Sequence, residues 1–123
     1  MKLLIVDDSN LIRTRIASVV EATQMKGISI VGLARNGREA VRIARVSRPD
    51  VVTMDLTMPE MDGVETIREL MRMPDPPNIL VVSALNDKST AITALRMGAR
   101  GFINKPFTDD ELRLALLDVC NPN

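Results

Sequence analysis

Aromatic side chains are nearly absent from this chain of 123 residues, which has two phenylalanines and neither tryptophan nor tyrosine. Since 46% of the residues are nevertheless hydrophobic, the interior must be built from aliphatic side chains and methionine. A chain of this length forms about one domain. We therefore expect residues 1–123 to be a single domain.

An excess of charge of one sign is also lacking, because sixteen acidic and sixteen basic residues cancel. This balance gives no overall field for nucleic acid or an anionic membrane, so we expect neither direct nucleic-acid binding nor membrane insertion. No apolar run has membrane-spanning length, and the N-terminus lacks the features of a signal peptide. The single cysteine, Cys120, cannot form an internal disulfide and is interpreted as a packing residue. A cytoplasmic protein is the expectation.

Short apolar runs alternate with amphipathic segments along the chain, which is the pattern of alternating strands and helices. The predicted strands are residues 3–6, 28–34, 51–54, 79–82 and 101–104. The predicted helices begin after Ser9, near Gly37, at Asp62-Gly63, near Asp87 and near Thr108. Five strand–helix units indicate an α/β fold with five helices on both faces of a parallel sheet. We predict a doubly wound five-stranded sheet of order 2-1-3-4-5, which puts the more polar second strand at an edge.

Polar side chains follow four of the predicted strands at the points where they end. Asp7 and Asp8 follow strand 1, Asp55 follows strand 3, Ser83 follows strand 4 and Lys105 follows strand 5. In this strand order the winding reverses between strands 1 and 3, and ligands bind outside their carboxyl ends. We expect all five side chains to converge there.

The chemistry of this set points to phosphoryl transfer. Three carboxylates in one crevice repel one another, and desolvation raises their pKa values. Mg²⁺ relieves the conflict, since it prefers oxygen ligands and is commonly held by one or two carboxylates plus a phosphate. Lys105 supplies positive charge, and the Ser83 hydroxyl can donate to a phosphoryl oxygen. The candidate nucleophile is Asp55, a carboxylate able to form an acyl phosphate.

Each feature alone also has a purely structural explanation. Paired aspartates before a helix commonly favour its dipole, and an aspartate or serine after a strand is commonly a turn residue. The methionines are interpreted as core or loop fillers, because thioethers suit other metals; they are Met54, Met58, Met61 and Met71. The conjunction of five polar positions at one edge of the sheet favours the functional interpretation.

Four motifs resemble those of response-regulator receiver domains of two-component signalling, in particular the stand-alone chemotaxis type. They are LIVDDS at residues 4–9, MDLTMPEMDG at 54–63, VVSA at 81–84 and KPF at 105–107. The resemblance extends over essentially the whole chain and implies a flavodoxin-like fold. It also implies that Asp55 is the phosphoacceptor. Mg²⁺, with Mn²⁺ as a substitute, would be bound by Asp8 directly, by Asp7 mainly through water, by Asp55 and by the backbone carbonyl of Thr57.

The resemblance further implies how phosphate is bound and sensed. Lys105 contacts the phosphoryl group, and its peptide bond to Pro106 is cis. Ser83 is the switch hydroxyl, and Ala84 is small enough to give phosphate access. Phe102 occupies the position of the switch aromatic residue.

Hydrolysis of the aspartyl phosphate is expected to depend on Thr57 and Leu85, which border the attacking water in the family. Neither side chain carries a carboxylate or carboxamide to orient that water, whereas such a group does so in other phosphoryl-transfer sites. The expected loss of phosphate is therefore slow for a chemotaxis-like receiver.

The resemblance implies partners as well. A sensor histidine kinase or phosphotransfer protein donates the phosphoryl group, and the chain is not otherwise an enzyme, because it catalyses only its own phosphorylation and dephosphorylation. A downstream protein binds the face formed by the fourth helix, fifth strand and fifth helix. In the last helix Leu114 points away from the apolar arc. The alternative is an N-terminal receiver fragment of a larger regulator with a DNA-binding or enzymatic output domain.

Three rival functions share parts of this pattern. A flavin or nucleotide module needs a Gly- or Ser/Thr-rich phosphate loop after strand 1, where this chain has Asp7 and Asp8. A haloacid-dehalogenase-like phosphatase has an Asp-x-Asp motif on strand 1, whereas here Ser9 stands two positions after Asp7. A pseudo-receiver that only binds partners is disfavoured by the intact set of polar residues.

Overall fold

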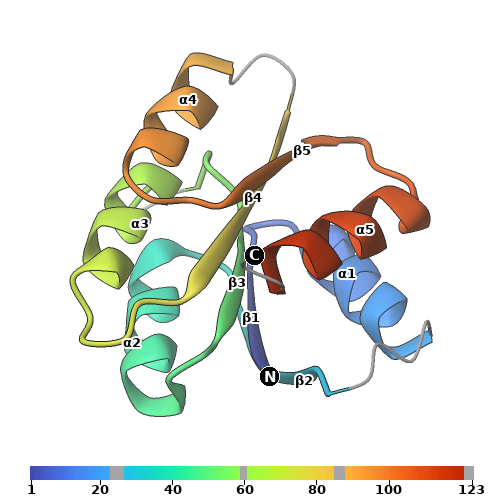
Figure 1. Cartoon of the computed structure of the whole chain (residues 1–123), viewed down its shortest axis with the longest axis horizontal. Helices are drawn as coiled ribbons and strands as arrows, with labels where there is room; N and C mark the ends of the chain where they lie inside the picture. The colour runs from blue at the N-terminus through green and yellow to red at the C-terminus, as the bar shows by residue number, and fades with distance from the viewer. Residues whose placement is uncertain (23–26, 59–60, 85–87, 121–123) are drawn as a thin grey trace.

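The computed structural model describes residues 1–22, 27–58, 61–84 and 88–120. Strands and helices alternate through this part of the chain (Figure 1). The strands are β1 (Lys2–Val6), β2 (Ser29–Ala34), β3 (Val51–Met54), β4 (Asn78–Ala84) and β5 (Gly101–Lys105). The helices are α1 (Asn10–Ala22), α2 (Gly37–Ser47), α3 (Gly63–Met71), α4 (Lys88–Arg96) and α5 (Asp109–Cys120). Among the described residues, none of these helices has both the length and the apolar character needed to cross a bilayer.

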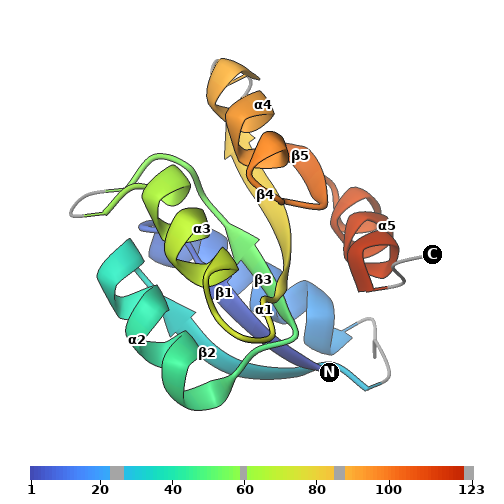
Figure 2. The same ribbon diagram turned by 60° about the vertical axis from the view of Figure 1, so that its left-hand side comes forward.

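The sheet has the order β2-β1-β3-β4-β5, and its adjacent strands are parallel. The predicted doubly wound topology is therefore confirmed, and the more polar β2 does lie at an edge. Helices α1 and α5 cover one face of the sheet, and α2, α3 and α4 cover the other (Figures 1 and 2). The winding reverses between β1 and β3, so their carboxyl ends form the crevice predicted to hold the site.

Two aliphatic clusters hold these layers together. One lies between the sheet and α2, α3 and α4, with Leu4, Val52 and Ile79 fully buried in it. The other lies between the sheet and α1 and α5, and it contains Ile5 and Leu116. The central strands are apolar on both faces because helices cover both sides of a parallel sheet. As the composition predicts, the described interior is mostly aliphatic.

Short-range hydrogen bonds fix where the helices begin. Asn36 and Asp62 accept from backbone N–H groups three residues later, at 2.8 and 2.9 Å. At the start of α5, Thr108 and Glu111 form the predicted reciprocal capping box, with bonds of 2.9 and 3.1 Å. Each such cap contributes about 1 kcal/mol. Ser9 caps α1 through a bond of 3.3 Å from the Ile12 N–H.

Strands β4 and β5 are longer than the apolar runs predict. The polar Ser83 pairs with Asn104, and Ala84 pairs with Lys105, so the ladder continues past the apolar residues. At the other end of β4, the Asn78 side chain donates to the Val119 carbonyl at 2.9 Å. Backbone pairing with the neighbouring strand, and not the polarity of the side chains, therefore determines where β4 and β5 end. As a result, Ser83 and Lys105 belong to the sheet and not to flexible loops.

Gly63, the first residue of α3, lies directly against the chain that leaves β3. A Cβ atom there would overlap the carbonyl oxygen of Asp55 and lie 2.5 Å from the Cα of Leu56. The Gly63 N–H also donates to the Leu56 carbonyl at 3.0 Å. The absence of a side chain therefore lets α3 begin against the backbone of the predicted phosphoacceptor.

We predict that Gly63→Ala destabilises the fold by roughly 1–3 kcal/mol, because the new methyl group meets backbone that cannot move aside cheaply. Gly32→Ala is the matched control, since the three heavy atoms nearest to a Cβ at Gly32 belong to the side chains of Ile43 and Leu4 and not to backbone. Urea denaturation of both variants measures the effect. A Gly63→Ala protein no less stable than Gly32→Ala would contradict this account of the α3 start.

Candidate functional site

Three carboxylates come together where β1 and β3 end. Carboxylate oxygens of Asp7, Asp8 and Asp55 all lie within 4.8 Å of one another. Parallel pairing sets this position, because Val6 is opposite Met54 and the Asp55 N–H donates to the Val6 carbonyl at 3.0 Å. Asp7 and Asp55 are buried, whereas Asp8 is exposed. The cluster is thus closed on the protein side and open to water on the Asp8 side.

Lys105 joins the two buried carboxylates. Its Nζ lies 2.7 Å from Asp7 Oδ2 and 3.5 Å from Asp55 Oδ1. Because β4 separates β5 from β3, the lysine side chain must pass the end of β4 to reach them. The ladder partner of Lys105 there is Ala84, whose small side chain leaves room for that path.

The surroundings change the proton affinity of two of these groups. Burial and the charge of Asp7 raise the pKa of Asp55 from 3.8 to about 6, although Lys105 and the Thr57 N–H act in the opposite direction. For Lys105, burial disfavours the charged form, but the hydrogen bond to Asp7 and the charge of Asp55 outweigh it and raise the pKa. At neutral pH, Asp55 is therefore mostly ionised and Lys105 is a cation.

The donor set fits a hard divalent cation. All three ligand residues offer carboxylate oxygens, and Lys105 balances only one of their three negative charges. Since Asp8 is exposed, water molecules can complete a coordination shell on that side. The geometry is therefore compatible with a divalent metal.

The structure brings the loop after β3 to the same place. The Thr57 N–H lies 3.4 Å from Asp55 Oδ1, so the backbone folds back around the carboxylate. The metal-binding role of the Thr57 carbonyl stays a prediction. Leu85, the other residue expected to tune dephosphorylation, lies outside the described residues.

The residues expected to bind and sense phosphate lie on β4 and β5. Ser83 is fully buried at the carboxyl end of β4, and Phe102 packs against the aliphatic cluster under α2, α3 and α4. Strand periodicity puts Ser83 on the same face as Val81, the ladder partner of Phe102. The Lys105–Pro106 peptide bond is cis. Both switch residues are thus placed on one face of the sheet, and their coupling stays a prediction.

Three residues that help to build the site were missed from the sequence. Arg13 donates from its guanidinium to the Asp7 carbonyl at 2.6 Å, which ties α1 to the acidic loop. Arg15 donates to the Phe107 carbonyl at 2.6 Å and lies over the Phe107 ring, 4.7 Å from its centre. Asn104 is the ladder partner of Ser83, and its Oδ1 is buried without a hydrogen-bond partner among the described residues. Of these three residues, Arg13 was the one that its position in the sequence could have indicated, because it lies in the first turn of the helix predicted to follow the acidic loop.

This fold and this site together define a class of protein, the receiver domains of two-component systems. The chain belongs to the response regulator receiver domain family, whose model matches residues 3–117. It is 39% identical over 118 residues to the chemotaxis protein CheY of Thermotoga maritima, and the match covers 96% of both chains.

A second kind of relative is much longer than this chain. Identity to the protein-glutamate methylesterase/protein-glutamine glutaminase of Alkalilimnicola ehrlichii is 46% over 110 residues, which is 89% of this chain but 28% of that protein. The chain is therefore similar to a stand-alone protein and to part of a longer one.

Solved structures show the same fold. The response regulator domain of Thermotoga maritima CheB matches with a TM-score of 0.80 and 31% identity, covering 95% of this chain and 96% of that one. A complex of CheX, CheY, BeF3 and magnesium from Borrelia burgdorferi matches with a TM-score of 0.88 and 28% identity, covering 98% and 90%.

The acidic cluster predicts a stabilising response to metal. Mg²⁺ at a hundredfold excess over its dissociation constant should raise the free energy of unfolding by about 2.7 kcal/mol, because it binds the folded cluster and not the unfolded chain. Asp8→Asn should raise the melting temperature without metal, since one repelling charge is gone, and should abolish the Mg²⁺ response. The exposed Asp75→Asn serves as the control. Thermal melts with and without Mg²⁺ measure both effects, and a Mg²⁺ shift that survives in Asp8→Asn would place the metal elsewhere.

Proposed function

We propose that this chain is a phosphorylation-controlled switch, in which Asp55 accepts a phosphoryl group from a sensor histidine kinase or a phosphotransfer protein. The observation that carries the proposal is the contact of Lys105 with both Asp7 and Asp55 inside a three-carboxylate cluster. A structural ion pair needs no third carboxylate and no open side. A metal-assisted site with a carboxylate nucleophile uses both, because further carboxylates hold the cation and the open side admits the phosphoryl donor.

The side chains have distinct roles in this reaction. An Asp55 oxygen attacks phosphorus, the new P–O bond forms, and the bond from phosphorus to the donor breaks with its electron pair on the donor. Lys105 then pairs with the phosphoryl oxygens, and the Ser83 hydroxyl donates to one of them beside the small Ala84. Mg²⁺, or Mn²⁺ in its place, held by Asp7, Asp8, Asp55 and the Thr57 carbonyl, would neutralise charge on the transferring group. This chemistry is confined to the chain's own phosphorylation and dephosphorylation, so we propose no enzymatic activity on other substrates.

Relatives support the metal and the phosphoryl group. The similar CheY of Borrelia burgdorferi was solved with CheX, BeF3 and magnesium. Its chain and this one share the whole fold, and the carboxylates described above offer the oxygen ligands that magnesium prefers. The proposed partners and the single unpaired cysteine fit a cytoplasmic location.

The output surface is proposed to be the α4–β5–α5 face. Leucine and isoleucine side chains are exposed on both of its helices: Ile92 and Leu95 on α4, and Leu114 and Leu117 on α5. As predicted, Leu114 points away from the core and is 57% exposed. A downstream protein would bury these side chains, whereas direct nucleic-acid binding is not proposed.

A second candidate keeps the same chemistry but places it at the N-terminal end of a larger regulator with an enzymatic or DNA-binding output domain. The match to 28% of the methylesterase of Alkalilimnicola ehrlichii favours it. In that case the α4–β5–α5 face would contact the output domain of the same protein.

Phosphorylation at Asp55 is tested with acetyl phosphate and Mg²⁺. We predict that intact mass spectrometry shows one added phosphoryl group on the wild-type chain and none on Asp55→Asn, because the amide is not a nucleophile. Asp75→Asn should label like wild type, because this exposed aspartate lies near Lys2 and Asp50 at the amino ends of β1 and β3, opposite the carboxyl ends that carry the site. Equal labelling of Asp55→Asn and wild type would reject Asp55 as the acceptor.

The switch is tested by separating labelling from its consequence. Ser83→Ala should still accept the phosphoryl group on Asp55, but the phosphate-dependent chemical shifts of α4, β5 and α5 amides should fall to a small fraction of their wild-type size. The reason is that phosphate shifts a population only through contacts that differ between the two states. NMR of the labelled and unlabelled proteins makes the comparison, and shift changes of wild-type size in Ser83→Ala would rule out this coupling.

A further inference from the structure

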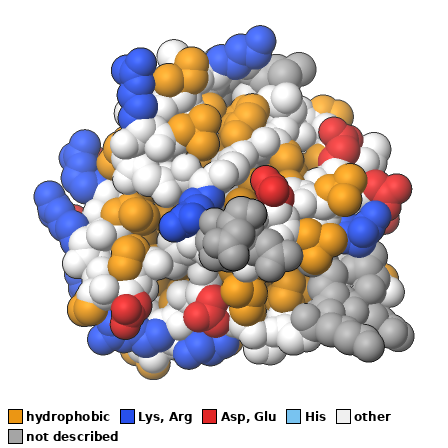
Figure 3. Space-filling model, viewed as in Figure 1, with side chains coloured by type: hydrophobic (Ala, Val, Ile, Leu, Met, Phe, Trp, Pro, Cys, Tyr) orange, Lys and Arg blue, Asp and Glu red, His pale blue; other side chains and the backbone are white. Residues whose placement is uncertain are grey.

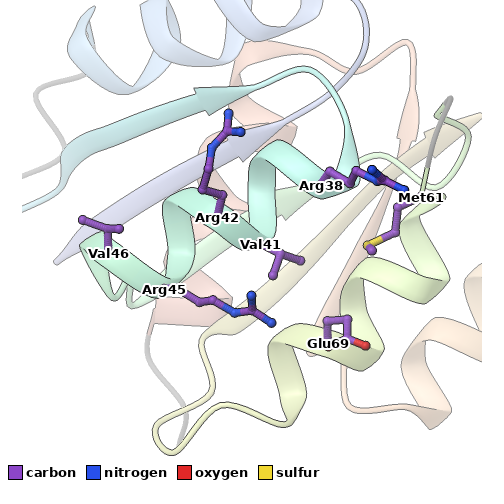
Figure 4. A pocket seen from close by; sticks show the side chains of 7 residues that line it. All are labelled: Arg38, Val41, Arg42, Arg45, Val46, Met61 and Glu69. Atoms are coloured by element: carbon purple, nitrogen blue, oxygen red, sulfur yellow. The ribbon is translucent and has the colours of Figure 1, made fainter.

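A groove between α2 and α3 lies on the opposite face of the sheet from α5 (Figures 1 and 4). It has a volume of about 690 Å³. We call it the α2–α3 groove and define it by its lining residues Arg38, Val41, Arg42, Arg45, Val46, Met61 and Glu69. Arg38 extends from α2 toward Met61, and Arg45 extends toward Glu69 (Figure 4). None of these residues belongs to the acidic site or to the α4–β5–α5 face.

The groove carries positive charge that the described residues do not balance. Glu39 contacts Arg42 at 3.9 Å and is shared with Arg35 at 3.5 Å. Within residues 1–22, 27–58, 61–84 and 88–120, no carboxylate lies in salt-bridge distance of Arg38 or Arg45. The chain as a whole is neutral, so this charge is a local feature of α2.

The positive charge continues along the molecule. A neighbouring hollow of about 250 Å³ shares Arg45 and Glu69 with the groove and adds Arg48 and Arg72. The carboxylate of Glu69 is already engaged by Arg72 at 3.4 Å. Figure 3 shows basic side chains gathered along the left and lower left edges of the view, where α3 and α2 lie in Figure 1.

Apolar side chains lie between the arginines. Val41 is buried in the floor and Met61 is half-buried in the wall. Val46 at the outer end of the groove is 84% exposed, the highest value among the exposed large hydrophobic side chains of the described residues. Arginine and methionine together with buried apolar contacts are typical of protein–protein interfaces. A charged surface that only faces water would have no use for exposed apolar side chains between its arginines.

We propose that the α2–α3 groove binds a short acidic, amphipathic segment of a partner protein. The carboxylates of that segment would meet Arg38, Arg42 and Arg45, and its apolar side chains would cover Val46 and Met61. Charge complementarity selects this occupant over a neutral or basic one. Since α2 and α5 cover opposite faces of the sheet, the segment leaves α5 uncovered.

Nucleic acid fits the groove less well. Nucleic-acid phosphates would meet the arginines but would leave the apolar Val41, Val46 and Met61 uncovered. Single strands also gain affinity by stacking bases on aromatic side chains, and no described residue lining the groove is aromatic. An amphipathic acidic protein segment can meet the arginines and also cover the apolar side chains.

The test uses the unphosphorylated full chain, labelled with ¹⁵N, and a synthetic peptide of about 14 residues, which spans α2 if it is helical at about 1.5 Å per residue. The peptide carries Glu and Asp on one face and Leu on the other, and a scrambled peptide of the same composition is its control. We expect saturable shifts of α2 and α3 amides with the amphipathic peptide and at least a threefold weaker effect with the scrambled one. Equal binding of the two peptides would overturn the proposal.

Charge reversal on the protein separates this groove from general electrostatics. The triple variant Arg38→Glu/Arg42→Glu/Arg45→Glu should raise the dissociation constant about tenfold or more, since exposed charge pairs each contribute modestly. The matched variant Lys88→Glu/Arg96→Glu/Arg100→Glu carries the same charge change at exposed positions of α4 and the turn after it and should stay within about twofold of wild type. Equal losses in the two variants would overturn the proposal.

The apolar part has its own variant. Val46→Ser should weaken peptide binding about threefold or more without affecting the fold, because the side chain is exposed and the change adds no charge, whereas the exposed Leu114→Ser on α5 should leave peptide binding unchanged. Single-stranded DNA and anionic lipid vesicles serve as competitors. If either competitor displaces the peptide when its concentration of negative charges is below that of the peptide, the groove has a different occupant and the proposal is overturned. The proposal is also overturned if the chain associates with itself and the α2 triple variant abolishes that association.

Discussion

The contact of the Lys105 ammonium group with Asp7 and Asp55 is the constraint on which the rest of the structure depends. Two buried carboxylates this close repel each other, and desolvation adds to the cost. The lysine relieves that cost only because the strand order puts β5 one strand away from β3, with Ala84 at the end of the strand between them. The α1 arginines add to this arrangement, since Arg13 binds the carbonyl of Asp7 and Arg15 binds that of Phe107, just after Lys105.

One ammonium group against three carboxylates leaves the site with an excess of negative charge, and that imbalance links structure to function. Burial of Asp55, together with this excess of negative charge, holds its pKa at about 6, so the group is mostly ionised at neutral pH but at an energetic cost. A divalent cation can relieve the remaining repulsion, which is why we propose metal-dependent phosphorylation as the function. The buried Ser83 and the half-buried Phe102 lie on one face of the sheet, and their part in relaying a change at the acidic cluster stays a prediction.

Much of this was predictable from the sequence, because local chemistry decides it. Apolar runs located the strands, and the residues after them located Asp7, Asp8 and Asp55; the Thr108–Glu111 capping box formed as its spacing predicts. The lengths of β4 and β5 were not predictable, since pairing across the sheet determines them. The contact of Arg15 with Phe107 joins residues 92 positions apart and has no local signal. The α2–α3 groove likewise depends on how two helices lie side by side.

The most direct measurement of the central claim is the titration of the Asp55 carboxyl carbon by ¹³C NMR, in wild type and in Lys105→Met without metal. In wild type the midpoint should lie at about pH 6, because burial and Asp7 outweigh Lys105. In Lys105→Met the midpoint should be higher still, since the cation that lowers this pKa among the described residues is removed. A wild-type midpoint near 3.8 that does not move in Lys105→Met would contradict the claim that Lys105 controls the charge of this cluster.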